Sequence, residues 1–387
     1  MSQMLTVDDL KKRARLRVPK MFFDYADSGA YTQSTYQSNQ DDFKKIKLRQ
    51  RVLVDMSNRS LKTTMIGQNV AMPVALSPTG LTGMQHADGE ILAAQAAEEF
   101  GVPFTLSTMS ICSIEEVAKA TKKPFWFQLY VMKDRDFIKN LILRAKAANC
   151  SALVLTLDLQ IMGQRHKDLR NGLSTPPKFT PKHIWQMMTR PLWCWQMLQT
   201  KNHTFGNIIG HAKGVSNLSS LSSWTAEQFD EKLNWDDVAW IKEIWQGSLI
   251  LKGILDSEDA IMASKTGADA IIVSNHGGRQ LDDAPSSISV LPEIVDAVGK
   301  KIEIHLDGGV YSGQNILKAL ALGAKSTFIG RPFLYGLGAN GKQGVTQCLN
   351  ILAKELDTTM ALCGKRDVKD IDHTVLYHGG KILKNMA

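Results

Sequence analysis

Cysteine is sparse in this sequence, and the few cysteines present are poorly placed for cross-linking or for binding metal. The 387 residues include five cysteines, an odd number with wide spacing and no Cys-x-x-Cys pair. A disulfide scaffold needs matched pairs, and a structural zinc site needs clustered ligands. The sequence therefore predicts neither, and it is typical of a protein that folds in a reducing compartment.

Long apolar runs are also missing. The stretch from Met65 to Gln85 is uncharged and long enough to span a bilayer, but it carries Pro73, Pro78 and three internal glycines. Such residues break helices, so the stretch predicts a strand with loops. Near the N-terminus, no apolar core follows the basic cluster Lys11–Arg13, unlike the pattern of a signal peptide. We expect no transmembrane helix.

Acidic residues are absent between Leu169 and Ala226. Most of the net charge of +8 comes from six cations of that segment: Arg170, Lys178, Lys182, Arg190, Lys201 and Lys213. The rest of the chain is close to neutral, and 44% hydrophobic with 22% charged residues is ordinary for a folded protein. Nucleic-acid binding would call for a wider basic face, so we expect no nucleic-acid partner.

Short apolar runs alternate with segments of helical periodicity along most of the chain. The runs predict eight strands, at Pro73–Ser77, Pro103–Ser107, Pro124–Tyr130, Ala152–Asp158, Leu249–Gly253, Ala270–Asn275, Glu303–Asp307 and Ser326–Gly330. The periodic segments predict eight helices, at Gly89–Phe100, Ser113–Thr121, Asp134–Asn149, Trp235–Gln246, Ser257–Thr266, Val290–Val298, Gly313–Leu322 and Gly344–Leu362. Eight such pairs favour a parallel sheet closed as an α/β (β/α)₈ TIM barrel. An open doubly wound sheet is the alternative, but no Gly-x-Gly-x-x-Gly follows the first strand.

The chain shows no linker and no low-complexity segment, so we expect one domain over residues 1–387. Its predicted parts are a helical N-terminal cap (1–60), the barrel (61–365), a long loop after the fourth strand (159–234) and a tail (366–387). That loop is far longer than the usual connection of about 2–6 residues.

The most informative segment runs from Ser274 to Asp282, directly after a buried strand. It presents His276 and Arg279 at the strand end, with two glycines between them. Imidazole can take a proton near neutral pH, and a guanidinium can hold a carboxylate through two parallel hydrogen bonds. The pattern predicts proton abstraction beside an anchored carboxylate, although a glycine turn with a surface His and Arg is the plainer alternative.

The other predicted strand ends also carry polar side chains and glycines. They are Pro78-Thr79-Gly80, Ser107, Gln128-Leu129-Tyr130, Thr156-Leu157-Asp158 with Arg165 soon after, Lys252, Asp307-Gly308-Gly309 and Gly330-Arg331. One such residue would most simply be a satisfied polar group of the core. Because a barrel collects its active site at this edge, the whole set predicts a catalytic centre.

These motifs resemble the FMN-dependent family that oxidises L-2-hydroxy acids, which includes lactate dehydrogenases, glycolate oxidases and mandelate dehydrogenases. The likeness runs from about Val18 to Gly364, and the Ser274–Asp282 segment is its most specific part. Within the family, Arg49–Leu53, Phe104–Thr108 and Leu251–Asp256 look most like the quinone-linked L-lactate dehydrogenases of bacterial membranes.

The resemblance implies roles for the substrate-facing residues. His276 would be the general base, taking either the hydroxyl proton or the α-proton, with Asp158 fixing its tautomer. Arg279 and Tyr25 would hold the substrate carboxylate with help from Arg165. Tyr130 would hydrogen-bond the oxygen that becomes a ketone.

The resemblance also implies an FMN site, and no metal. Lys252 would lie near the ring nitrogen and oxygen that become anionic on reduction, although a lysine there could instead form a Schiff base. Of the remaining FMN residues, Pro78, Thr79, Gly80, Ser107, Gln128 and Thr156 would contact the ring, and Gly308, Gly309, Gly330 and Arg331 would contact the phosphate. Ser274 and Asp307 would also bind the cofactor. The sequence departs from the family pattern in three places. Tyr311 stands where relatives place a phosphate-contacting arginine, Leu159-Gln160 follows Asp158 where relatives often have a proline, and Met109 stands where glycolate oxidases have tryptophan.

Part of the long loop, Pro181–Leu198, combines three tryptophans with two cations and no acidic residue. This composition suits the headgroup zone of a membrane, although a lid packed on the barrel or on a second subunit is the alternative. We therefore expect a peripheral protein on the cytoplasmic face of the inner membrane, in contact with anionic lipid. It would oxidise L-lactate to pyruvate with a membrane quinone as acceptor, and by resemblance form a tetramer. The alternatives are a soluble oxidase that uses O₂, a mandelate-type dehydrogenase, a flavin-free barrel lyase, and a non-catalytic docking protein.

Overall fold

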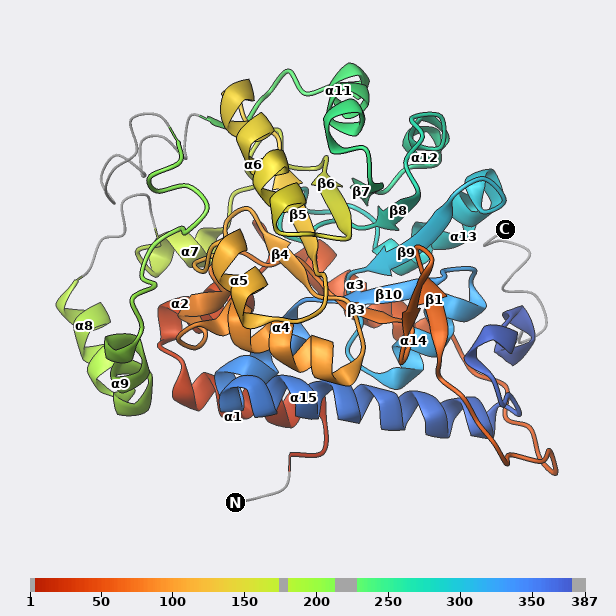
Figure 1. Ribbon diagram of the computed structural model, residues 1–387. Coiled ribbons are helices and arrows are strands. Elements are labelled where there is room, and N and C mark those ends of the chain that lie inside the picture. Colours follow the sequence, from red (N-terminus) through yellow and green to blue (C-terminus); the bar gives the residue numbers. More distant parts are fainter. Residues whose placement is uncertain (1–3, 174–179, 213–227, 378–387) are drawn as a thin grey trace.

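Eight parallel strands wrap into a barrel in the computed structural model, which describes residues 4–173, 180–212 and 228–377 (Figure 1). The hydrogen-bonded order is β3-β10-β9-β8-β7-β6-β5-β4, and a parallel bridge between Leu76 and Phe104 joins the two ends of that order. The strands are β3 (Val74–Leu76), β4 (Thr105–Ser107), β5 (Trp126–Tyr130), β6 (Ala152–Thr156), β7 (Ser248–Ile254), β8 (Ala270–Val273), β9 (Glu303–Asp307) and β10 (Ser326–Ile329). The predicted (β/α)₈ fold is confirmed.

The barrel interior is filled at one end. Trp126 and Phe328 lie inside the barrel among small and β-branched side chains of the other strands. A hairpin of β1 (Thr63–Met65) and β2 (Gln68–Val70) packs Met65 and Val70 against these interior side chains. Trp126 Nε1 also donates to Gln68 Oε1 of the hairpin at 3.3 Å. The interior packing therefore leaves the opposite end, where the strands finish, for a site.

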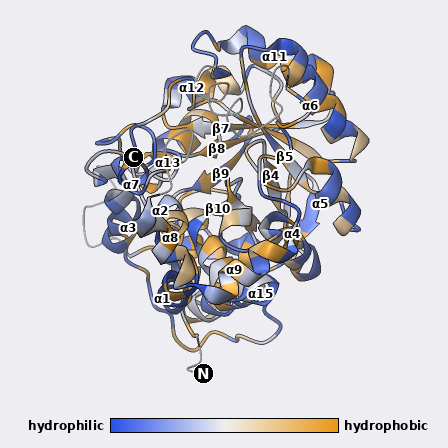
Figure 2. Ribbon diagram, turned by 90° about the vertical axis from the view of Figure 1, so that its left-hand side faces the viewer, coloured by the Kyte–Doolittle hydropathy of each residue, from blue (hydrophilic) through white to orange (hydrophobic). Residues whose placement is uncertain are grey.

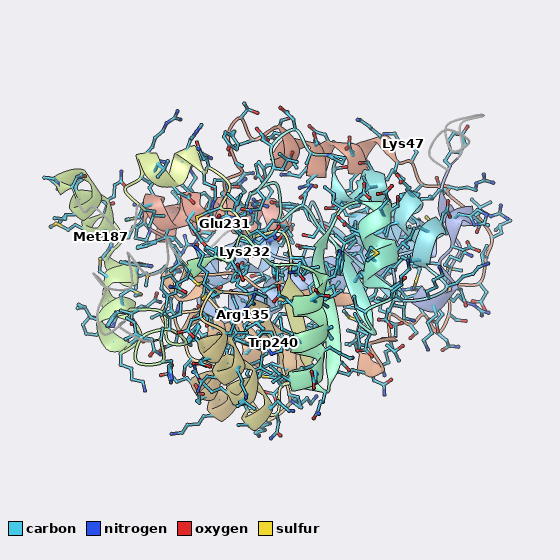
Figure 3. The ribbon with its side chains drawn as sticks, turned by 90° about the horizontal axis from the view of Figure 1, so that it is seen from above. Lys47, Arg135, Met187, Glu231, Lys232 and Trp240 are labelled. Atoms are coloured by element: carbon cyan, nitrogen blue, oxygen red, sulfur yellow. The ribbon has the colours of Figure 1, made fainter. Side chains whose placement is uncertain are left out.

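Helices cover the outside of the barrel, and each presents one apolar face to the strands. They are α4 (Gly89–Phe100), α5 (Ile114–Ala120), α6 (Arg135–Ala147), α11 (Trp235–Trp245), α12 (Ser257–Ala263), α13 (Ser287–Val298), α14 (Gly313–Ala321) and α15 (Arg331–Leu362). Ser113 and Glu116 form a capping box before α5. Figure 3 shows Arg135 beside Trp240, where the α6 guanidinium lies 5.4 Å from the α11 ring centroid.

Helix α15 begins earlier than the sequence indicated, at Arg331 rather than Gly344. It consists of two helical pieces across a break at Asn340 and Gly341. Glycines in the first piece made it look non-helical in the sequence, but they allow the two pieces of α15 to pack closely. A Cβ on Gly336 would lie 2.4 Å from the carbonyl oxygen of Gly344. Four glycines within nine positions favour a loop in the sequence, but in the structure Gly336 and Gly338 lie in the first helical piece while Gly341 belongs to the break.

The N-terminal cap lies against the barrel mouth. Its helices are α1 (Val7–Arg17), α2 (Lys20–Ala26) and α3 (Ser34–Lys45), and α1 packs along α15. Asp282 accepts hydrogen bonds from the backbone N–H groups of Thr32 and Thr35, at 2.8 and 3.1 Å. The end of the Ser274–Asp282 segment thus ties the cap to the barrel.

The long loop after β6 carries short helices near the mouth: α7 (His166–Arg170), α8 (Pro181–Met188) and α9 (Pro191–Gln199). Figure 3 places Met187 of α8 at the outer edge of the molecule. Two cations of the acid-free segment, Lys178 and Lys213, lie outside the described residues, as do residues 378–387 of the tail. Within the described ranges, no helix combines the length and the hydrophobicity that a membrane crossing requires.

Candidate active site

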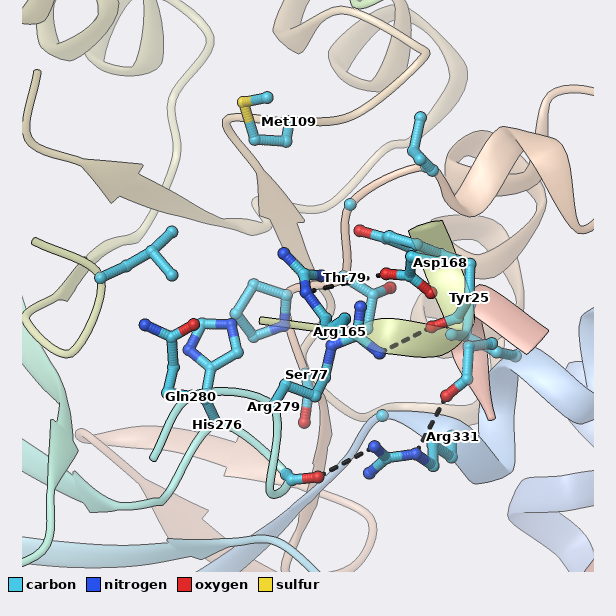
Figure 4. Close-up of a pocket in the computed structure, with 18 of the residues that line it drawn as sticks. Tyr25, Ser77, Thr79, Met109, Arg165, Asp168, His276, Arg279, Gln280 and Arg331 are labelled. Atoms are coloured by element: carbon cyan, nitrogen blue, oxygen red, sulfur yellow. Dashed lines mark hydrogen bonds and ion pairs between the residues drawn. The ribbon is translucent and has the colours of Figure 1, made fainter. Parts of the chain in front are cut away.

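A cavity of about 870 Å³ opens where the barrel strands end, between the cap and the long loop. Its lining includes fourteen of the residues singled out in the sequence: Tyr25, Pro78, Thr79, Gly80, Tyr130, Arg165, Lys252, His276, Arg279, Asp307, Gly308, Gly309, Gly330 and Arg331. Figure 4 shows Arg165 and Arg279 close to Tyr25, and His276 beside Gln280. The fold therefore brings most of the predicted site to one place.

His276 is oriented by Asp158. The imidazole Nδ1 lies 2.9 Å from Asp158 Oδ1, and the histidine backbone is left-handed with φ 57°. A carboxylate accepts a hydrogen bond from Nδ1–H, so Nε2 is left as the nitrogen that can take a proton. Asp158 does not itself line the cavity, and it acts on the site through the imidazole.

The electrostatics of this pair favour a neutral imidazole at rest. Burial lowers the pKa of His276 below its ordinary value, and the Asp158 carboxylate opposes this without reversing it. Burial raises the pKa of Asp158, but the contact with His276 and the charge of Lys252 together bring it below its ordinary value. A neutral imidazole beside an ionised carboxylate is the form required of a general base.

The glycines after His276 serve the packing of the cap. Gly277 and Gly278 have φ values of 66° and 70°, and a Cβ on Gly278 would lie 2.5 Å from the backbone nitrogen of Tyr36. A Cβ on Gly277 would lie 2.7 Å from Arg331 Nη1. These two glycines therefore make room for cap backbone and for the Arg331 guanidinium.

Two arginines and a tyrosine form a cationic end of the cavity. Arg279 Nη1 donates to the backbone carbonyl of Tyr25 at 2.6 Å, and the Arg279 guanidinium lies 4.7 Å from the Tyr25 ring centroid. Arg165 lies 5.8 Å from the same centroid. Burial, followed by the charge of Arg165, lowers the pKa of Arg279 to about 10, which still leaves the guanidinium charged at neutral pH. This pair is suited to bind a carboxylate.

Tyr130 completes the polar wall from the end of β5. Burial raises the pKa of its phenol well above the ordinary value. The hydroxyl therefore stays protonated and can donate a hydrogen bond to an oxygen held in the cavity.

The side chains predicted to contact the flavin ring are of two kinds. Lys252 lines the cavity, and its Nζ contacts both Ser274 Oγ and Asp307 Oδ2 at 3.1 Å. This ion pair engages the nitrogen, whereas Schiff-base chemistry needs a free amine. Burial raises the pKa of Asp307, but Lys252 and its hydrogen-bond donors bring it below the ordinary value.

Beneath the lining lies a chain of buried hydrogen bonds. Ser107 Oγ donates to Gln128 Oε1 at 2.9 Å, and Gln128 Nε2 donates to Thr156 Oγ1 at 3.0 Å. These three side chains, like Ser274, do not line the cavity, so direct contact with the ring stays a prediction.

The cavity also ends in free donors that suit a phosphate. Arg331 uses Nε and Nη2 for backbone carbonyls of Ala26, Ser28 and Gly277, while Nη1 has no acceptor among the described residues. The Tyr311 hydroxyl is buried without a hydrogen-bond partner in the described part of the chain. With Lys252 and the Pro78–Gly80 backbone on the same cavity, the residues present fit FMN.

The glycines at this end have a second reason to be glycine. Gly309 has φ 77°, and a Cβ there would lie 1.8 Å from the carbonyl oxygen of Asn39 on α3. Gly308 has φ 114° and would meet Ser287 Oγ at 2.9 Å. Their identity is therefore fixed by the contact between cap and barrel as well as by any ligand.

Three residues of the site escaped the sequence reasoning. Ser77 Oγ donates to Asp307 Oδ1 at 2.9 Å, and Gln280 Nε2 donates to the Asp158 carbonyl at 2.7 Å. Asp168 lies 3.7 Å from Arg165 and lines the cavity. The sequence did carry a signal for each of them. Ser77 ends a predicted strand, Gln280 lies inside the Ser274–Asp282 segment, and Asp168 is the last acidic residue before the acid-free stretch.

The chain matches a family model described as FMN-dependent dehydrogenase over residues 14–378. It is 44% identical over 379 residues to an L-lactate dehydrogenase of Acinetobacter baylyi, covering 98% of each chain. It is 46% identical over 378 residues to an L-lactate dehydrogenase of Haemophilus influenzae, covering 97% of this chain and 99% of that one. Among solved structures it is similar to the monotopic membrane protein (S)-mandelate dehydrogenase, with TM-score 0.92, 35% identity, and coverage of 97% and 100%.

Proposed function

Because this chain belongs to the family of FMN-dependent dehydrogenases, we propose that it oxidises L-lactate to pyruvate and that a membrane quinone takes the two electrons. The family, the FMN cofactor and the activity of an L-2-hydroxy-acid oxidoreductase, all implied by the sequence, are confirmed. Lactate as the substrate draws its support from the similar L-lactate dehydrogenases. The observation that carries the proposal is the His276–Asp158 contact of 2.9 Å in a cavity shared with Arg279.

The chain's own residues would bind and deprotonate the substrate. Arg279 and Arg165 hold the carboxylate, which places the neighbouring CH–OH group toward His276. Nε2 of His276 takes one proton, and Asp158 stabilises the imidazolium that forms. Tyr130 donates a hydrogen bond to the oxygen as it becomes a ketone.

FMN, when bound, supplies the two-electron redox chemistry. The residues that would hold it are Lys252 at the ring, the Pro78–Gly80 backbone beside it, and Arg331 with Tyr311 at the phosphate. Overall, the CH–OH group of lactate loses two electrons and two protons, and a quinone gains them to become a quinol.

The exposed faces of α8 and α9 support a membrane location. Large apolar side chains there are exposed: Ile184 49%, Trp185 66%, Met188 66%, Leu192 56%, Trp195 61% and Leu198 80%. Beside them, Arg190 Nη2 lies 3.5 Å from the Arg15 carbonyl of α1, whose last turn is basic and where Leu16 is 66% exposed. Figure 2 views the molecule from the side that carries these helices. Apolar and cationic groups on one surface suit an anionic bilayer, which we take to be the cytoplasmic face of the inner membrane.

Stopped-flow reduction of the bound flavin by a panel of L-2-hydroxy acids tests the substrate. L-lactate should reduce it fastest, and faster reduction by L-mandelate would replace lactate as the substrate. His276→Gln should slow reduction by several orders of magnitude while FMN stays bound, because it removes the proton acceptor. Near-normal reduction of that variant by lactate would refute the role of the base.

Peroxide yield tests the electron acceptor. A dehydrogenase that uses quinone should release little hydrogen peroxide per lactate oxidised in air, and should be accelerated by decylubiquinone. One peroxide per turnover would show instead that the enzyme is an oxidase.

A further inference from the structure

We propose that the apolar end of the cavity binds the quinone, which reaches it from the bilayer alongside α9. This inference rests on the proposed function, since it assigns a place to the electron acceptor. The assignment gives the two substrates different routes into the cavity. Lactate arrives from water, whereas a quinone with an isoprenoid tail stays in the membrane.

The cavity has an apolar part besides the cationic end and the donors that suit a phosphate. Arg165, Arg279 and Tyr25 form the cationic end described above, with His276 near it. The other lining is apolar and comes from the cap, from η1 (Thr82–Met84) and from the loops that follow β4 and α9: Met21, Phe22, Met84, Met109, Ile111 and Phe205. Lactate carries a single methyl group and has no use for this surface.

The apolar end also holds a few hydrogen-bonding groups. His203 and Thr204 line the cavity directly before Phe205. A quinone head needs this combination, because its ring is apolar while its two carbonyl oxygens accept hydrogen bonds. Flexible methionine side chains adapt readily to a flat ring.

Helix α9 connects this end to the proposed membrane surface. Trp193 is 8% exposed, stacks on Phe22 with ring centroids 5.4 Å apart, and donates from Nε1 to the Met84 carbonyl at 2.9 Å. Both Phe22 and Met84 line the cavity. Leu192, Trp195 and Leu198 of the same helix are more than half exposed, at 56%, 61% and 80%. One helix, about 10 Å across, thus separates the apolar cavity wall from a surface suited to lipid.

The charge distribution fits the same assignment. The lining side chains Met21, Phe22, Met84, Met109 and Ile111 are all uncharged, whereas Arg165 and Arg279 flank the Tyr25 ring. The apolar side chains therefore suit a neutral quinone, and the arginines suit an anionic acid. In the balanced reaction, the two electrons and two protons that leave the CH–OH group reduce the quinone to a quinol.

A charge placed in the apolar end tests the assignment. Met84→Glu puts a carboxylate at the cavity wall, and Met262→Glu makes the same change on an α12 side chain that is 40% exposed and does not line the cavity. Holoenzymes in detergent would be reduced with L-lactate and then reoxidised with decylubiquinone or with ferricyanide.

We expect Met84→Glu to slow reoxidation by decylubiquinone at least about tenfold, since a buried charge is costly to leave in contact with an apolar ring. Reduction by lactate and reoxidation by ferricyanide should stay within about twofold, and Met262→Glu should match the parent in all three rates. Reoxidation of Met84→Glu by decylubiquinone at the parent rate would overturn the proposal.

A second measurement holds even if Met84→Glu fails to fold. An azido-quinone photolabel on the unaltered holoenzyme should mark peptides from α2, η1 or residues 203–205, and labelling confined to other peptides would overturn the assignment. Failure of the proposed function is distinguishable, because it would appear as a flavin that L-lactate does not reduce, whatever the photolabel marks.

Discussion

Asp158 and His276 are separated by 118 positions in the sequence, yet Oδ1 of one lies 2.9 Å from Nδ1 of the other. Each follows a different barrel strand, and the closed sheet brings the two strand ends together. The contact fixes which imidazole nitrogen is free, so changes at Asp158 should act through the base.

Asp158→Asn should slow flavin reduction by L-lactate by about 10²–10⁴-fold, because the amide neither fixes the tautomer nor stabilises the imidazolium. The carboxylate raises the pKa of His276 against the larger lowering by burial. Its loss should therefore move the acidic limb of the rate profile to lower pH. A stopped-flow pH profile measures both effects, and an acidic limb that moves to higher pH would contradict the assigned contact.

Arg279→Lys should weaken lactate binding. The guanidinium donates to the Tyr25 and Ser28 carbonyls and stacks on the Tyr25 ring, and lysine can reproduce neither the fork nor the stacking. We expect the Kd for lactate from the reductive half-reaction to rise about tenfold or more, with FMN content unchanged.

Arg165→Lys is the matched comparison for that change. Arg165 contacts Asp168 at 3.7 Å and the Tyr25 ring centroid at 5.8 Å, longer distances than those of Arg279. The rise in the Kd for lactate should therefore be smaller for Arg165→Lys. A larger effect at Arg165 would reassign the main carboxylate ligand.

Tyr311→Phe should weaken FMN binding while leaving riboflavin binding unchanged. The Tyr311 hydroxyl is buried and has no partner in the described part of the chain, so it is available to the phosphate. A hydrogen bond to a charged group contributes about 1.5–3 kcal/mol, which corresponds to a loss of at least about tenfold in FMN affinity. Fluorescence of the released flavin measures both constants.

Tyr335→Phe provides the control for that measurement. Its hydroxyl donates to Asp27 at 2.8 Å, and it does not line the cavity. It should leave the FMN Kd unchanged, and equal losses of FMN and riboflavin at Tyr311 would show that the phenol does not act on the phosphate.

Trp185→Ser, Trp195→Ser and Leu198→Ser together should release the protein from anionic vesicles. Each apolar side chain buried in a membrane contributes on the order of 2 kcal/mol, so partitioning should fall at least about a hundredfold. These substitutions spare Trp193, whereas removal of all of Pro181–Leu198 would uncover Phe22. Cosedimentation with vesicles measures the loss, and turnover with a soluble dye should persist.

Val52→Ser with Leu53→Ser is the control. These side chains are 74% and 103% exposed, and they belong to the segment before β1 and not to α8 or α9. Equal release by both sets would refute a specific docking surface.

Glu90→Gln should change how stability depends on pH. The side chain is 1% exposed, Oε1 accepts from the backbone N–H groups of Gly83 and Ile111, and burial raises the pKa of the carboxyl. A raised folded pKa means that its stability contribution is present below the unfolded pKa near 4.5 and is lost as the pH rises through the folded pKa. The Tm of the variant relative to the parent should therefore rise between pH 5 and pH 8, and a constant difference would contradict a buried, proton-retaining carboxyl.

Periodicity in the sequence was enough to predict the barrel, because alternating apolar runs and helical repeats are local patterns. The same holds for the Ser274–Asp282 segment, where His276 and Arg279 are delivered by one strand end. Helix α15 shows the limit of this reasoning, since its glycines acquire a helical role only through the close approach of Gly336 and Gly344.

The amino-acid order by itself determined the fold class, the family and most residues of the mouth. Only the tertiary structure decided that Ser107, Gln128 and Thr156 bond to one another below the lining, that Gly278 makes room for cap backbone, and that Trp193 backs an apolar cavity wall. The physical reason is that strand and helix patterns arise from neighbours along the chain. Contacts such as that of Trp193 with Phe22 depend on how the cap and the long loop pack over the barrel. The spacing of residues along the chain does not determine this packing.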